Sequence, residues 1–315
     1  MTIQTRHRPA PQLEPATPGG SPRPAGATAP QGPSPSVPEA RRHGATDMLR
    51  RLVAAPGATL SALFLALLLG WVIAPGAFAT HHPLEAVGAS LAPPGGEFWL
   101  GTDLNGRDVY SRVVHGSRLS LLAGVVAVLI SLVVGGLLGM VAGYIGGFVD
   151  TIISRTVEVL VSIPGLLLSL AIISVLGFGV DKVAIAVGIA GIPGMVRIAR
   201  AETLRIVNLP YMDAATTSGT RRLTGIITHV VPNASGAIGV VAGIDLGGAI
   251  LAVASLSFLG FGAVPPQPEW GSQINEGRMY IANAWWWTLF PSIIAGLTVL
   301  SVNRLSRGIG AEEVR

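Results

Sequence analysis

The chain has 315 residues; half of them are hydrophobic, 12% are charged, and the mean hydropathy is +0.59. A soluble domain of this length cannot bury so much apolar surface, whereas a lipid bilayer can accommodate it. The net charge of +4 does not indicate nucleic-acid binding, because the arginines lie between apolar runs and form no stripe with interleaved aromatic residues. The absence of cysteine excludes disulfides, thiolate metal sites and cysteine nucleophiles.

Residues 1–45 differ in composition from the rest of the chain. Pro, Ala, Gly and Ser dominate, and four prolines fall between Pro22 and Pro33. Such a segment cannot bury enough apolar surface to offset the entropy lost on ordering, so we predict that it is disordered. The first apolar run begins too late for a removable secretory signal. We therefore expect residues 1–45 to be a cytoplasmic tail.

Six mostly apolar segments follow, and about 20 such residues are needed for a helix to cross a membrane. In chain order they are Thr59–Phe78, Leu119–Tyr144, Ile152–Gly177, Val183–Ile198, Ala234–Phe261 and Trp285–Val302. The predicted fold class is all-α, a polytopic membrane protein with about six transmembrane helices. We divide it into a first transmembrane helix with an external loop at 46–118 and a core transmembrane domain at 119–315.

The basic residues predict the orientation of these helices. With the amino terminus in the cytoplasm, 16 of the 21 Lys and Arg residues fall on the cytoplasmic side. Cytoplasmic segments of membrane proteins carry such an excess. An even number of spans then places both termini in the cytoplasm.

The second predicted span contains a stripe of glycines, Gly135, Gly139, Gly143 and Gly147, at intervals of four residues. Small residues allow helices to approach closely in lipid. We interpret the stripe as a helix-packing surface, within the chain or toward a partner, and keep a substrate contact as the alternative.

The segment between the fourth and fifth spans, Ala201–Val231, is too polar for the membrane. Pro210 suits the start of a helix, and Asp213 would lie in the first turn, where its charge complements the helix dipole. Residues that would share one face of this helix are Tyr211, Ala214, Ala215 and Ser218. Gly219 would then allow the chain to turn. We predict a short helix with a small-residue face that inserts into a groove of a cytoplasmic partner.

The same segment resembles a known family. Asp213-Ala214-Ala215, then Gly219 and Pro232, resemble the EAA loop of the permeases of ATP-binding-cassette importers. Asp213 stands where this family usually has Glu. The loop then extends over about 201–232 and contains the coupling helix.

Two further stretches resemble the dipeptide, oligopeptide and nickel branch of these permeases, specifically its second permease. Leu100–Leu121 resembles the approach to the second span, and Leu256–Arg278 resembles the last external loop. The external-loop motif residues are Asp103, Gly106, Arg107, Asp108, Glu269 and Trp270. Among them, we expect Asp103, Arg107 and Asp108 to form a salt-bridged turn that caps the external side, with a gating role as the alternative. The resemblance covers about Gly95–Asn303, whereas Arg304–Arg315 departs from the usual family tail.

The resemblance implies a set of partners in a bacterial cell membrane. These are a second, homologous permease, two ATPase subunits and an extracytoplasmic substrate-binding protein, in addition to membrane lipid. The residues that would couple to the ATPases are Tyr211, Asp213, Ala214, Ala215, Gly219 and Pro232. ATP and magnesium would be bound by the ATPases, because this chain has no phosphate-binding loop and its one lysine, Lys182, falls outside. We expect no cofactor on this chain and no enzymatic activity.

Other residues have two interpretations each. Asp245 lies inside the fifth span, where a charge is costly to bury unless it faces a partner or water. It is therefore either a contact in the translocation path or one member of a structural pair. Adjacent His81 and His82 could be metal ligands but are more often incidental, and we predict no metal site. Ser117, after His115-Gly116, could suggest a membrane serine protease, but the sequence has no Gly-x-Ser-x-Gly nucleophile elbow to support it. We predict no catalytic residues.

The predicted function is therefore that of a permease subunit for peptides, or for a related small solute such as a nickel complex. The alternative is an ATP-independent secondary transporter or channel, for which inverted repeats are typical. An intramembrane enzyme would need a catalytic constellation that the sequence lacks.

Overall fold

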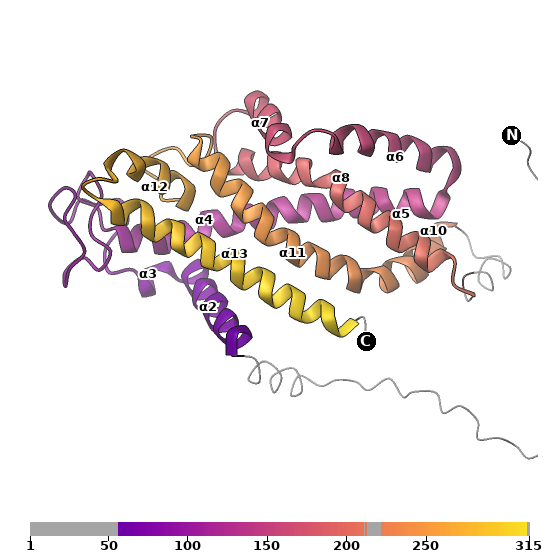
Figure 1. The fold of residues 1–315 in the computed structure, drawn as a ribbon, viewed down its shortest axis with the longest axis horizontal. Helices are drawn as coiled ribbons and strands as arrows, with labels where there is room; N and C mark the ends of the chain where they lie inside the picture. Colours follow the sequence, from indigo (N-terminus) through magenta and orange to yellow (C-terminus); the bar gives the residue numbers. More distant parts are fainter. Residues whose placement is uncertain (1–55, 211, 213–221, 314–315) are drawn as a thin grey trace, which may run out of the picture. The chain divides into compact units, whose positions relative to one another are not determined.

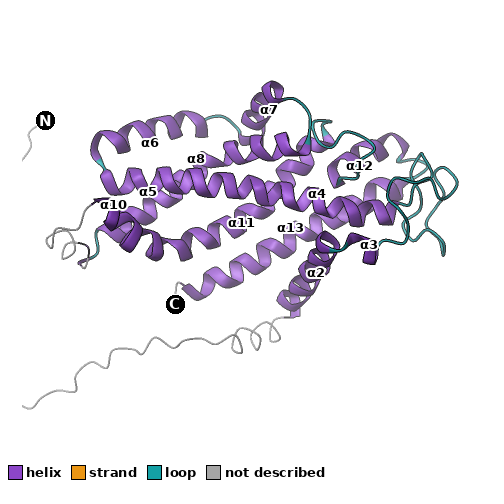
Figure 2. Cartoon of the chain, turned by 180° about the vertical axis from the view of Figure 1, so that it is seen from behind, coloured by secondary structure: helices purple, strands orange, loops and turns teal. Residues whose placement is uncertain are grey.

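The computed structural model describes residues 56–210, 212 and 222–313. Within these ranges the secondary structure is helical, apart from one isolated antiparallel bridge between Thr102 and Asp108 (Figure 2). The predicted all-α class is confirmed for this part of the chain. The predicted tail, residues 1–45, lies outside the described residues.

The α-helices in chain order are α2 (Pro56–Ile73), α3 (Pro75–Phe78), α4 (Val109–Ile130), α5 (Gly136–Ile145), α6 (Gly147–Val161), α7 (Gly165–Leu176), α8 (Val180–Val207), α10 (Arg222–Gly225), α11 (Val231–Phe258), α12 (Trp270–Gly277) and α13 (Trp285–Glu313). Two π-helical segments, η1 (Ser131–Gly135) and η2 (Ile226–Val230), join α4 to α5 and α10 to α11, and a 3₁₀ turn, η3 (Arg278–Tyr280), follows α12.

Four continuous helices in the described ranges are long and apolar enough to cross a membrane: Val109–Ile145, Val180–Val207, Ile226–Phe258 and Trp285–Gly308. The pair α6 and α7 would make a fifth span, although the two helices are bent by 93°. The first helix, α2, is apolar but shorter. The predicted number of about six spans is thus approximate, with one broken helix and one short one.

The third predicted span, Ile152–Gly177, is wrong as a single helix. Helix α6 ends at Val161 and α7 begins at Gly165. Pro164 between them lacks an N–H and disfavours helical backbone at the residue before it, so the hydrogen-bonded ladder stops there. Proline also shortens the first span, since α2 ends at Ile73, just before the separate turn α3 that Pro75 opens.

The second span begins earlier than predicted, at Val109 and not at Leu119. The carboxylate of Asp108 caps this helix by accepting a hydrogen bond of 2.9 Å from the backbone N–H of Ser111. The predicted boundary between the segment 46–118 and the core domain 119–315 stays a prediction. In the structure this boundary falls inside α4. The predicted polar loop is also shorter in the structure, because α8 continues to Val207.

Helix α8 is central to the bundle and packs against α4, α5, α7 and α11. A Cβ at Gly135 would lie 2.8 Å from the carbonyl oxygen of Ile192, and one at Gly143 would lie 2.9 Å from that of Arg200. Gly139 packs against α8 in the same way. The predicted packing stripe is confirmed for these three glycines. Gly147 does not continue the stripe on the same helix, because α5 ends at Ile145 and Gly147 begins α6 with a positive φ of 56° and nothing of this chain within 4 Å of an added Cβ.

The two ends of the helical bundle are formed by different elements. Helices α3 and α12 and the loop 79–108 gather at one end, whereas α10 and the end of α8 lie at the other (Figure 1). We call the first of these the loop end and the second the α10 end. In the predicted orientation the loop end is external and the α10 end is cytoplasmic.

Candidate translocation and coupling sites

The loop end is organised around the buried carboxylate of Asp103. One of its oxygens accepts hydrogen bonds from the backbone N–H groups of Asn105 and Arg107, at 2.8 and 3.0 Å. The other accepts a hydrogen bond of 2.7 Å from Nε of Arg107. Gly106 closes this turn with a φ of 73°, a conformation that side chains disfavour. The motif Asp-x-x-Gly-Arg is therefore a turn folded around its own aspartate.

Arg112 joins this turn to the distant helix α12. Its side chain is fully buried, and its Nε lies 3.4 Å from a carboxylate oxygen of Asp103. One of its terminal nitrogens donates to Glu276 at 3.3 Å, and the other donates to the carbonyl oxygen of Pro266 at 3.3 Å. Burial raises the pKa of Glu276 above the usual carboxyl range, although the positive charges of Arg112 and Arg107 oppose this effect. One guanidinium thus connects three segments of the chain.

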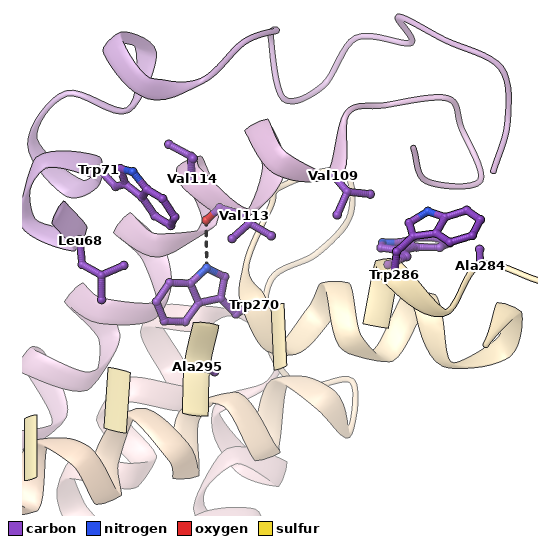
Figure 3. Packing of buried hydrophobic residues seen from close by; sticks show 10 residues of the cluster. Leu68, Trp71, Val109, Val113, Val114, Trp270, Ala284, Trp286 and Ala295 are labelled. Atoms are coloured by element: carbon purple, nitrogen blue, oxygen red, sulfur yellow. Dashed lines mark hydrogen bonds between the residues drawn. The ribbon is translucent and has the colours of Figure 1, made fainter. Parts of the chain in front are cut away.

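Glu269 and Trp270 attach α12 to α4. The buried Glu269 carboxylate caps α12 by accepting hydrogen bonds from the backbone N–H groups of Gly271 and Ser272, at 3.0 and 2.8 Å. It also accepts a hydrogen bond of 2.8 Å from the hydroxyl of Ser120 on α4. The indole N–H of Trp270 donates to the carbonyl oxygen of Val113 at 2.9 Å (Figure 3).

The six external-loop motif residues therefore lie in one region of the molecule, although the two motifs are about 160 residues apart. We call the group of buried and half-buried charged residues at this end the loop-end cap: Asp103, Arg107, Asp108, Arg112, Glu269 and Glu276. Sequence analysis did not single out Arg112 or Glu276 as site residues. The available signal was an arginine and a glutamate inside the two motif stretches, with nothing to indicate that they meet.

The histidines and the serine weighed as metal ligands or as a nucleophile have other contacts among the described residues. Nδ1 of His81 lies 3.7 Å from Asp108, whereas Nδ1 of His82 lies 3.6 Å from Glu85. Among the described residues there is no group of three or more His, Asp and Glu side chains that could hold a metal ion. The buried hydroxyl of Ser117 donates to a carbonyl oxygen of its own helix at 2.6 Å.

A cavity of about 360 Å³ lies among α4, η1, α7, α8 and α11. Its walls are formed mainly by small and apolar side chains. The lining residues are Ala127, Val128, Ser131, Gly165, Leu166, Ser169, Val187, Ala190, Gly191, Gly194, Asp245, Gly248, Ala249 and Ala252. Asp245 is the one charged residue among them. We call this space the Asp245 cavity.

Two irregular features of the helices border the Asp245 cavity. Ser131 belongs to the π-helical segment η1, and π-helical turns are frequent at functional sites. Gly165 and Leu166 begin α7, directly after the break in the third span. No described residue forms an ion pair with Asp245. The described part of the chain therefore gives no support to the interpretation of Asp245 as one member of a structural ion pair.

The coupling prediction falls mostly outside the described residues, since Tyr211, Asp213, Ala214, Ala215 and Gly219 are not among them. The residues on either side are described. Met212 is buried in a cluster with Ile206, Val230 and Ala234, at the α10 end. Pro232 lies in the first turn of α11, directly after the π-helical segment η2. The described residues on the two sides of the predicted loop therefore lie close together, near the end of α8 and the start of α11.

Comparison with known proteins gives relatives over most of the chain. It is 41% identical to the glutathione transport system permease protein GsiD of Pectobacterium atrosepticum over 216 residues, which are 69% of this chain and 72% of that protein. It is 38% identical to the probable D,D-dipeptide transport system permease protein DdpC of Escherichia coli over 269 residues, 85% of this chain and 90% of that protein. Its identity to the di/tripeptide transport system permease protein DppC of Pseudomonas aeruginosa is 38% over 254 residues, 78% and 82% of the two chains.

A family model covers the larger part of the helical bundle. The model for the binding-protein-dependent transport system inner membrane component matches residues 135–311. This range includes most of the residues that line the Asp245 cavity, Asp245 among them, and both flanks of the predicted coupling loop. The match favours an ATP-binding-cassette importer over the ATP-independent transporter or channel. The chain belongs to the family of inner membrane components, or permeases, of binding-protein-dependent transport systems.

Proposed function

We propose that this permease passes small peptides through its bundle into the cytoplasm. The relatives compared above are named for the transport of glutathione, D,D-dipeptides and di- and tripeptides, all of them short peptides. The observation that carries the proposal is the Asp245 cavity, which contains one acidic group among small, apolar walls.

The chemistry of this cavity suits a short peptide. The carboxyl group of Asp245 accepts hydrogen bonds from the ammonium group at a peptide's amino terminus, and such contacts to charged groups are the stronger ones. Apart from Asp245, the walls carry no charged and no aromatic side chain that would select strongly among peptide residues. Discrimination then belongs to the external binding protein, and the permease offers a path that many peptides can follow.

The proposed complex contains the partners that the sequence resemblance implies. Those are a second permease, two ATPases that bind ATP and magnesium, and an extracytoplasmic binding protein. The predicted loop between α8 and α11 would insert its short helix into the ATPases at the α10 end. The excess of basic residues supports a cytoplasmic position for this end and for both termini.

The test of the path is peptide uptake by the whole complex in proteoliposomes. Asp245→Asn is expected to lower uptake of a labelled dipeptide by about tenfold or more, since a buried charge-assisted hydrogen bond contributes about 1.5–3 kcal/mol. Asp245→Glu keeps the acidic group and is expected to retain more uptake. Asp181→Asn, at the start of α8 and outside the cavity lining, is the matched control. Wild-type uptake by Asp245→Asn would contradict the proposed path.

Coupling and orientation have separate tests. Ala215→Trp places a bulky group on the small-residue face of the predicted helix, so it should abolish ATPase binding or peptide-stimulated ATP hydrolysis at normal permease abundance. Because the chain has no native cysteine, Thr217→Cys reports the side of this loop directly. Labelling of that cysteine by an impermeant external reagent would overturn the orientation.

A further inference from the structure

A second hollow lies at the outer surface of the bundle, between α2 and α13. It has a volume of about 740 Å³ and is separate in its lining from the Asp245 cavity. Its apolar walls are Leu60 and Phe64 from α2 and Leu297 and Leu300 from α13. Leu60 is 68% exposed and Leu300 is 66% exposed, which is unfavourable in water but not beside lipid chains.

One end of this hollow is basic. Arg304 and Arg307 of α13 line it, and none of the described residues that line it is acidic. The two arginines are three positions apart on one helix, a spacing at which like charges repel. The guanidinium of Arg304 lies against Gly57, where a Cβ would overlap it. Arg304 therefore reaches from α13 across to the first turn of α2.

The basic end also lies where α2 begins and α13 approaches its last described residues (Figure 1). Apolar helices end at the membrane surface, where phospholipid headgroups lie. Arg50 and Arg51 add two more basic residues to the sequence just before α2. The groove thus has basic side chains at the level of the headgroups and apolar side chains along the rest of its length. An anionic phospholipid has the matching parts, a negatively charged headgroup and apolar acyl chains.

We propose that the groove between α2 and α13 binds one anionic phospholipid. Its phosphate lies between Arg304 and Arg307, and an acyl chain lies along Leu60, Phe64, Leu297 and Leu300. The lipid would come from the membrane leaflet at the end of the bundle where the carboxyl terminus lies, which is the cytoplasmic leaflet in the proposed orientation. The site does not depend on the identity of the transported peptide.

The test is native mass spectrometry of the purified full complex titrated with phosphatidylglycerol or with phosphatidylcholine of the same acyl chains. The double variant Arg304→Gln/Arg307→Gln is expected to bind phosphatidylglycerol about 30-fold more weakly, since each basic residue near a charged surface changes affinity by about fivefold. Binding of phosphatidylcholine should not change. Leu300→Trp, which fills the groove without changing charge, should also weaken binding of phosphatidylglycerol.

The matched control is Arg155→Gln/Arg205→Gln, which removes two exposed arginines that do not line the groove. Equal loss in this control would show a general surface-charge effect and overturn the proposal. Wild-type phosphatidylglycerol binding by the Arg304/Arg307 double variant would overturn it too. Displacement of the lipid by millimolar inorganic phosphate would also overturn the proposal, because the site would then bind free phosphate. Cross-linking of a Ser301→Cys variant to the second permease in the intact complex would overturn it as well, because the groove would then be a protein interface. Because lipid binding is measured without transport, failure of the proposed peptide path would leave the result unaffected.

Discussion

The loop-end cap and the Asp245 cavity belong to the same bundle but are built in opposite ways. In the cap, the side chains of Asp103, Arg112 and Glu269 are fully buried, and those of Arg112 and Glu269 bond to distant parts of the chain. Around the cavity, small residues and irregular helix turns leave open space, and Asp245 is the one charged group. Buried ion pairs with fixed geometry resist rearrangement, whereas loosely filled space between helices permits it.

The two regions therefore differ in a mechanical property, since the cap is tightly bonded and the cavity is loosely filled. The cap bonds α4, α12 and the loop 79–108 to each other, while α7, η1 and the middle of α11 border the open space of the Asp245 cavity. Under the proposed function, a peptide path would need space that can change its shape, and a docking surface for the external binding protein would need a fixed structure. Substitutions in the cap should therefore reduce stability, and substitutions in the cavity should reduce uptake.

The largest effect on stability is expected for Arg112→Leu. Removing one member of a buried ion pair leaves the other charge uncompensated, which costs about 3–5 kcal/mol. Here Asp103 and Glu276 would both lose a partner. The thermal midpoint of the purified complex in detergent, together with permease abundance in the membrane, measures this loss.

Arg155→Leu is the control for that measurement. Arg155 forms an ion pair with Glu158 at 2.7 Å, but its side chain is 77% exposed. Surface pairs contribute about 0–1 kcal/mol, so this variant should melt close to the wild type. If the two substitutions destabilise equally, the cap is not the rigid part of the bundle.

Glu269→Ala should have the next largest effect. Its carboxylate accepts hydrogen bonds from Gly271, Ser272 and Ser120, so the substitution removes a helix cap and leaves buried donors without acceptors. Loss of a cap costs about 1 kcal/mol, and each unsatisfied buried donor costs about 1–3 kcal/mol. Protease resistance of the loop between α11 and α12 gives a local measurement. Unchanged resistance would contradict the role of Glu269 in holding α12 to α4.

The cap also shows why part of the site was hidden in the sequence. The second span was predicted from about Leu119, where a long, mostly apolar segment begins. The structure places Ser111 and Arg112 inside the helix, and Arg112 bonds to Glu276 and Gln273 of α12, more than 150 residues away in sequence. Spacing within a motif predicted the turn around Asp103, but no local pattern could show which distant segment pairs with it.

The middle of the bundle gives a second example, since the tripeptide Ile-Pro-Gly occurs at 163–165 and again at 192–194. The first copy is exposed and separates α6 from α7, whereas Pro193 is buried inside the 28-residue helix α8. Gly135 approaches the second copy so closely that a Cβ there would lie 2.8 Å from the carbonyl oxygen of Ile192. Packing against a neighbour thus holds one helix together where proline ends the other. Apolar content predicted both segments as spans, but only tertiary contacts distinguish them.

A smaller effect is expected for Gly139→Ala, at the tight contact between α5 and α8. The new Cβ would lie 2.7 Å from the Cβ of Ala199, and overpacking of this kind costs about 1–3 kcal/mol. Alanine regains about 0.5–1 kcal/mol of helix propensity, so the net loss should be about 1 kcal/mol. Gly239→Ala, where nothing lies within 4 Å of the new Cβ, should be neutral or stabilising in the same thermal assay. Equal behaviour of the two variants would show that α5 and α8 do not pack tightly.

The smallest effect concerns pH and comes from Glu276. Burial raises the pKa of this carboxyl group above the usual range, with Arg112 and Arg107 acting in the opposite direction. The folded state then binds the proton more tightly than the unfolded state, so the contribution of Glu276 to stability falls as the pH rises through its folded pKa.

Glu276→Gln removes this titration. The thermal midpoint of the wild type relative to Glu276→Gln should therefore increase as the pH is lowered from about 7 toward about 4.3, the ordinary pKa of glutamate. Because both proteins share every other titrating group, their difference isolates Glu276. A difference that shrinks on acidification would mean that the ion pair with Arg112 outweighs burial, and that the cap is held by charge pairing more than by its exclusion of water.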